Sequence, residues 1–265
     1  MRVARSYFVA GAMLIAVAGP TAAVDRWETV SLVAPVGDDD SSTINEPKHG
    51  AAQVGHDFDS ASDQDWVKVV GRARRSYEAR VWSGSMPWQS LACPPGACAS
   101  FDMVTNGGAV VVAGAPEAVP SGALSVRWAT GDVEELFYLR AQSNTGLGGF
   151  TYDLGLYETT MFLPRFNNSG TQTTVVILQN TRQTPVGGFV HFYDATGTHL
   201  HSQAITLQGN ATLVFPTATV PALQGASGSV QVAHTAGYGG LTGKAVALEP
   251  FTGFAFDTAQ TPLPY

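Results

Sequence analysis

The sequence has 265 residues, of which 45% are hydrophobic and only 13% are charged. This composition excludes wholesale disorder, and the low charge together with 29 glycines and 15 prolines favours strands joined by turns over long surface helices. A formal net charge of −7 and the lack of a basic cluster argue against nucleic acid as a partner. This length accommodates one large domain or two of ordinary size.

The chain begins with the pattern of a secretory signal peptide. Two arginines precede an apolar run at 8–18, and small residues surround a cleavage position after Ala23. Because the apolar run is much shorter than the roughly 20 residues of a membrane-spanning helix, we expect no membrane span. Residues 1–23 are therefore predicted to be a signal peptide, followed by a flexible lead-in at 24–42. The mature protein is predicted to be secreted or periplasmic.

Acidic residues divide the rest of the chain into two parts. Residues 24–158 contain 18 acidic and 9 basic side chains, whereas residues 159–265 contain 3 of each. Such an asymmetry suggests two domains with different surfaces. We place the first domain at 43–158 and the second at 159–258, with 259–265 as a C-terminal tail.

Hydrophobic residues in both parts alternate with a period of two, and turn residues separate the alternating segments. The strands predicted in the first part are 66–70, 77–82, 109–113, 124–128, 136–141 and 150–157. Those in the second part are 161–166, 173–180, 188–193, 199–207, 211–215, 227–233, 245–249 and 253–256. Many short strands at this spacing favour β-sandwiches. The predicted fold class is all-β, with two antiparallel β-sandwich domains in tandem after the signal peptide.

The first domain resembles a known bacterial family. The motif Asn45-Glu46-Pro47, the motif Asp63-Gln64-Asp65-Trp66 and closing strands at 137–141 and 152–156 occur in that order. In this pattern residues 43–157 resemble the bacterial pre-peptidase C-terminal domain, a β-sandwich appended to many secreted proteases and other exported proteins. The resemblance implies a role in processing, secretion or surface attachment. The second domain looks like the Ig-like β-sandwich modules of secreted bacterial proteins, a similarity of fold that carries no function.

The resemblance also implies a calcium site, because the family members found in collagenases bind calcium and collagen. Glu46, Asp63 and Asp65 are the positions that match the family's calcium ligands, and Ca²⁺ prefers hard oxygen ligands of this kind. The alternative is that the two aspartates only initiate and cap a turn. Calcium is the one cofactor that the resemblance implies.

Cysteines and tryptophans mark one loop region of the first domain. Cys93 and Cys98 are predicted to form a structural disulfide in an oxidising compartment. A redox-active pair is the alternative, but it usually has the tighter Cys-x-x-Cys spacing. Trp82 and Trp88 flank a short loop and are predicted to present a binding surface, because exposed aromatic rings stack on sugars and pack against peptides. The alternative is that Trp82 is simply the last core residue of its strand.

The second domain carries a histidine cluster on a predicted hairpin. With a three-residue loop at 195–197, His191 is expected opposite His201, and Tyr193 opposite His199. His191, His199 and His201 then share the solvent face and form a candidate site for Zn²⁺ or Cu²⁺. The alternative is a solvated polar face on which histidines happen to cluster.

The sequence lacks the common catalytic signatures, including Gly-x-Ser-x-Gly, His-Glu-x-x-His, the phosphate loop and the dinucleotide fingerprint. We therefore expect a non-enzymatic binding or adhesion module that recognises an extracellular polysaccharide or protein surface. One alternative is an accessory or processing module of an exported hydrolase system. Another is a β-sandwich hydrolase whose catalytic residues meet only in the folded chain.

Overall fold

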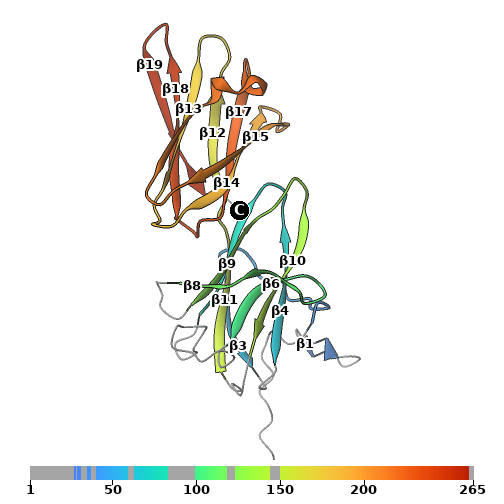
Figure 1. The fold of residues 1–265 in the computed structure, drawn as a ribbon. Helices are drawn as coiled ribbons and strands as arrows, with labels where there is room; N and C mark the ends of the chain where they lie inside the picture. The colour runs from blue at the N-terminus through green and yellow to red at the C-terminus, as the bar shows by residue number, and fades with distance from the viewer. Residues whose placement is uncertain are drawn as a thin grey trace, which may run out of the picture.

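The structure is a computed structural model that describes residues 27, 29–30, 35–36, 40–58, 63–82, 99–117, 123–143 and 150–262. Over this part the chain is almost entirely β, with two short 3-10 helices, η1 (Thr217–Thr219) and η2 (Pro221–Leu223). Four antiparallel sheets form two β-sandwiches, which Figure 1 shows end to end. The predicted all-β fold is confirmed. The predicted signal peptide lies outside the described residues, none of which form a helix long and apolar enough to cross a membrane.

The first β-sandwich is drawn in blue to green in Figure 1. Its strands are β3 (Ala52–Phe58), β4 (Gln64–Gly71), β5 (Ser76–Trp82), β6 (Ser100–Val104), β7 (Val110–Ala113), β8 (Ala115–Pro116), β9 (Leu124–Ala129), β10 (Glu135–Gln142) and β11 (Phe150–Glu158). In spatial order they form the sheets β4–β10–β6–β7 and β3–β11–β5–β9–β8. A two-stranded hairpin of β1 (Thr29–Val30) and β2 (Pro35–Val36) precedes them, within the segment that we predicted as a flexible lead-in.

The core of the first sandwich lies between its two sheets. It is built from the residues that alternate inward along each strand, such as Val67 and Val69 of β4. Its largest fully buried side chains are Phe58, Phe101, Leu124, Leu139, Tyr152 and Leu154. Each buried side chain of this size contributes about 1.5–3 kcal/mol, so this cluster drives the folding of the domain.

The second β-sandwich is drawn in yellow to red in Figure 1. Its strands are β12 (Met161–Asn167), β13 (Thr173–Asn180), β14 (Val186–Asp194), β15 (His199–Leu207), β16 (Thr212–Pro216), β17 (Ser227–His234), β18 (Leu241–Glu249), β19 (Phe254–Ala259) and β20 (Thr261–Pro262). They form the sheets β15–β14–β17–β12–β20 and β16–β13–β18–β19 around a separate apolar core. The predicted C-terminal tail is wrong in part, because Thr261 and Pro262 pair with Met161 and Phe162 of β12.

The connection between the two sandwiches is short and buried. Only Thr159 and Thr160 separate β11 from β12, and both side chains are buried. The backbone N–H of Ser76 donates to Oγ1 of Thr160 over 2.9 Å, and the carbonyl of Ser76 accepts the N–H of Thr159 over 2.8 Å. These bonds hold the start of the second domain against β5 of the first.

A buried carboxylate adds a second link between the domains. Glu78 of β5 is completely buried, and its Oε1 accepts a hydrogen bond from Nε of Arg127 over 2.8 Å. Its Oε2 forms an ion pair with Arg80 over 3.0 Å and accepts the backbone N–H of Tyr238, in the second domain, over 2.8 Å. A Cβ at Gly237 would lie only 2.7 Å from Oε1 of Glu78, so this glycine permits the close approach of the loop.

Candidate functional site

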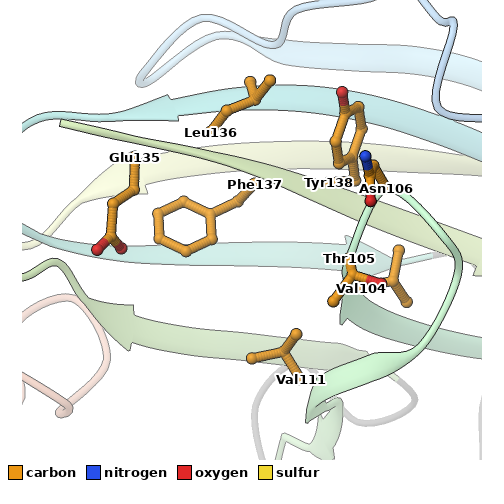
Figure 2. Close-up of a pocket in the computed structure, with 8 residues that line it drawn as sticks. All are labelled: Val104, Thr105, Asn106, Val111, Glu135, Leu136, Phe137 and Tyr138. Atoms are coloured by element: carbon orange, nitrogen blue, oxygen red, sulfur yellow. The ribbon is translucent and has the colours of Figure 1, made fainter.

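An open groove of about 520 Å³ lies on the first sandwich, between β10 and the hairpin formed by β6 and β7 (Figure 2). Strand β10 pairs with β4 along its whole length, but it pairs with β6 only from Tyr138 onward. The chain leaves β6 in a turn at Thr105, whose N–H donates to the carbonyl of Ala109 over 2.9 Å. Residues 135–137 of β10 therefore have a strand partner on one side only among the described residues.

The groove has an apolar interior and a polar rim. It is lined by Val104, Thr105, Asn106, Val111, Glu135, Leu136, Phe137 and Tyr138. Figure 2 shows the ring of Phe137 directed from β10 toward the side of the groove where Val111 lies. The side chain of Val111 is 56% exposed and that of Leu136 is 52% exposed, so the groove leaves apolar surface in contact with water.

A β-bulge explains why Val111 is exposed. Val112 lies opposite Met103 and Val110 lies opposite Val104, so Val111 is the extra residue of β7 and has no partner in β6. A bulged residue leaves the regular alternation, and its side chain can turn away from the core. The three successive valines of β7 give no sign of this bulge in the sequence.

The floor of the groove is part of the folded core. The ring of Phe137 packs against Trp128 with 5.9 Å between the ring centroids. Gly71 of β4 makes room for this ring, because a Cβ at Gly71 would lie 2.8 Å from Cε2 of Phe137. The groove is consequently preformed, since its floor is held by packing.

One of the two tryptophans of the predicted binding surface lies within the described residues. Trp82, the last residue of β5, is half-buried and lines a cavity of about 200 Å³ with Arg80, Ala123 and Tyr157. The ring of Tyr157 lies 6.1 Å from the ring of the exposed Tyr238. Trp82 thus ends strand β5 and faces a cavity, and its role in binding stays a prediction. The other members of the predicted loop site, Trp88, Cys93 and Cys98, lie outside the described residues.

The three predicted calcium ligands differ in environment. Glu46 is exposed and forms an ion pair with Lys68 over 2.6 Å. Asp63 and Asp65 are buried at the start of β4, where Oδ1 of Asp63 accepts the N–H of Gln64 over 2.9 Å. Asp65 accepts a hydrogen bond from the hydroxyl of Tyr152. In the described part of the chain no three His, Cys, Asp or Glu side chains are placed to hold a metal ion. The calcium site stays a prediction.

The histidine hairpin has the predicted loop but a different register. The N–H of Asp194 donates to the carbonyl of Thr198 over 2.9 Å, and Tyr193 lies opposite His199, as predicted. A β-bulge at Leu200 then adds one residue to β15, so that His201 lies opposite Phe192 and Ser202 lies opposite His191. The predicted pairing of His191 with His201 is therefore wrong.

Only two of the three imidazoles converge. Nδ1 of His191 and Nε2 of His199 each lie 2.8 Å from the hydroxyl oxygen of Ser202. The ring of His201 packs against Phe192 instead, with 6.4 Å between the centroids. The described hairpin thus does not assemble the predicted three-histidine metal site.

The side chain of His191 is buried, although the strand pattern places it on the solvent-facing side of the sheet. Residues 130–132 of the first domain lie next to it across a small cavity. This cover comes from a segment about sixty residues earlier in the chain, so the strand pattern around His191 does not reveal it.

No protein-family model matches this chain, and no curated protein sequence matches it.

Proposed function

We propose that this protein is an exported binding module that holds an extended polypeptide segment of a partner protein in the groove of Figure 2. The observation that carries the proposal is that β10 continues past the end of β6, next to an apolar interior. A strand added at an exposed sheet edge gains affinity from main-chain hydrogen bonds and specificity from its alternating side chains.

The dimensions and the lining of the groove support this proposal. A volume of about 520 Å³ lies within the range of about 300–1,000 Å³ that is usual for ligand sites. The space between Phe137 and Val111 suits an apolar side chain of the bound segment. Asn106 and Glu135 supply polar atoms at the rim for its backbone or its neighbouring side chains.

A polypeptide fits this groove better than a glycan does. Four lining residues, Val104, Val111, Leu136 and Phe137, have no polar side-chain atom. A glycan would bury hydroxyl groups against them, and a hydroxyl that loses its hydrogen bonds costs about 1–3 kcal/mol. Apolar peptide side chains carry no such penalty.

Glycan binding is the second candidate function, and the Trp82 cavity favours it. Tryptophan and tyrosine rings with a nearby guanidinium, as provided by Trp82, Tyr157 and Arg80, suit the apolar face and the hydroxyl groups of a sugar. This cavity is separate from the groove, so the two functions can be tested independently.

Selection from a random peptide library displayed on phage tests the proposal. The purified chain is expected to enrich extended sequences with an apolar residue. Val111→Glu should weaken the selected peptide at least about tenfold, because it places a carboxylate in the apolar interior. Val214→Glu is the matched control, since Val214 is an equally exposed valine of the second domain. Enrichment of no peptide, or equal binding by both variants, would contradict the proposal.

A further inference from the structure

A serine hydroxyl lies between two imidazoles where the second sandwich meets the first. Ser202 of β15 faces His191 of β14, and its Oγ lies 2.8 Å from Nδ1 of His191. The same Oγ lies 2.8 Å from Nε2 of His199, at the start of β15. Both contacts have the length of good hydrogen bonds. The proposed groove function uses none of these residues.

A single hydroxyl proton can be donated to only one of the two imidazoles. Oγ of Ser202 therefore donates to one ring nitrogen and accepts a proton from the other. Nε2 of His199 is the acceptor when that ring carries its proton on Nδ1, and Nδ1 of His191 is then the donor to Oγ. This assignment gives a chain of two bonds in one direction.

Both imidazoles are neutral near pH 7. Burial, with smaller contributions from His199 and Arg74, lowers the pKa of His191 to about 4. Burial and the positive charge of Arg74 also lower the pKa of His199. Asp132, which forms an ion pair with Arg74 over 2.8 Å, opposes these shifts at both rings. A neutral His199 can accept a proton from Ser202.

The serine opens onto a cavity of suitable size. Ser202 and His191 line a space of about 200 Å³ together with Thr130, Gly131, Asp132 and Phe189. His191 is 4% exposed, and its Nε2 has no hydrogen-bond partner among the residues that the structure describes. A buried polar atom without a partner beside a cavity is uncommon and points to a ligand that supplies the missing bond.

We propose that Ser202 is a nucleophile that cleaves small acyl esters, with His199 as its general base and His191 as a hydrogen-bond donor to Oγ. A nucleophile within hydrogen-bond reach of a base is the first element of covalent catalysis by a serine. Arg74 adds positive charge near both imidazoles, and its ion pair with Asp132, which lines the cavity, offsets part of that charge.

Water is the only reactant that the hydrolysis needs besides the ester. Oγ of Ser202 attacks the carbonyl carbon while Nε2 of His199 takes the hydroxyl proton. The ester C–O bond breaks, and the leaving alkoxide takes the proton from His199 to depart as an alcohol. Water then attacks the acyl-serine and gives a proton to His199, which returns it to Oγ as the carboxylic acid leaves. A cavity of about 200 Å³ admits a short acyl group such as acetyl and is too small to enclose a long alkyl chain.

Active-site labelling of the full chain tests the proposal. A fluorophosphonate probe should modify Ser202, as mapped by peptide mass spectrometry, and p-nitrophenyl acetate should be hydrolysed while p-nitrophenyl palmitate is not. Ser202→Ala should abolish both reactions, and His199→Gln should slow them about 100-fold, which is typical for loss of a general base. Ser229→Ala is the matched control, because Ser229 lies opposite Tyr193 on the neighbouring strand and should not affect either rate.

Labelling of the unmutated chain is decisive even if a variant fails to fold. An unmodified Ser202 under conditions that label a known serine hydrolase would overturn the proposal. Modification of Ser202 at the same rate in a folded His199→Gln variant would also overturn it. Loss of peptide binding by the groove variants bears on neither result, since the groove and the Ser202 cavity share no lining residue.

Discussion

Two buried histidines at the domain junction should make the protein sensitive to acid. His191 is 4% exposed and His234 is 1% exposed. In both cases burial is the main cause that lowers the pKa from 6.5 to about 4. The folded protein thus keeps both rings neutral at a pH where the unfolded chain protonates them.

The sign and size of the effect follow from proton linkage. Between pH 6.5 and pH 4 the unfolded chain binds more protons than the folded protein does, so stability falls as the pH falls through this window. A tenfold difference in proton affinity corresponds to about 1.4 kcal/mol. Each histidine should therefore remove about 2 to 3 kcal/mol of stability near pH 4.5, and the two together about 5 kcal/mol.

Urea unfolding at about pH 7.5 and about pH 4.5 measures this effect as the difference between two free energies of unfolding. In the double variant His191→Asn with His234→Asn, that difference should shrink by about 5 kcal/mol, because neither position then titrates. Gln203→Asn on β15 is the control, since it replaces one amide with another and should leave the difference unchanged. An acid sensitivity that is equal in the double variant and the parent would show that these two histidines do not cause it.

Two further predictions concern a buried carboxylate and the calcium site. Glu78→Gln should lower the free energy of unfolding by about 3 kcal/mol, because Arg127 and Arg80 lose a buried partner charge. Urea titrations measure this loss, and a value below about 1 kcal/mol would contradict the prediction. Millimolar Ca²⁺ should raise the Tm if the calcium prediction holds, and Asp63→Asn with Asp65→Asn should abolish that increase. An unchanged Tm of the parent protein in calorimetry would exclude a calcium site that stabilises the fold.

Strand alternation predicts most of the two sandwiches because most inward positions hold aliphatic or aromatic residues. Strand β13 is typical, with Val176 and Leu178 fully buried at alternate positions. Strand β3 was not predicted, because two of its inward positions hold the buried polar residues Gln53 and His56. They are satisfied by hydrogen bonds, from Gln53 to Asn45 over 2.6 Å and between His56 and Gln53 over 3.1 Å. Because these inward residues are polar, the hydrophobicity of β3 does not alternate along the strand with a period of two.

The candidate sites depend on features that strand patterns do not contain. The groove exists because β6 ends before β10 does and because β7 contains a bulge at Val111. The contact of Ser202 with two histidines depends on the bulge at Leu200. Bulges shift the register by one residue, and tertiary packing rather than local sequence selects their positions. The cover over His191 comes from another domain and is equally invisible in the local sequence.

Amide hydrogen exchange of the chain with and without a selected peptide tests the groove most directly. Residues 135–137 pair on one side only, so a segment added as a strand should protect amides in this stretch of β10 from exchange. We expect slower exchange there on binding, with the exchange of the second domain unchanged. Saturating binding that leaves the exchange of residues 135–137 unaltered would contradict the proposed function.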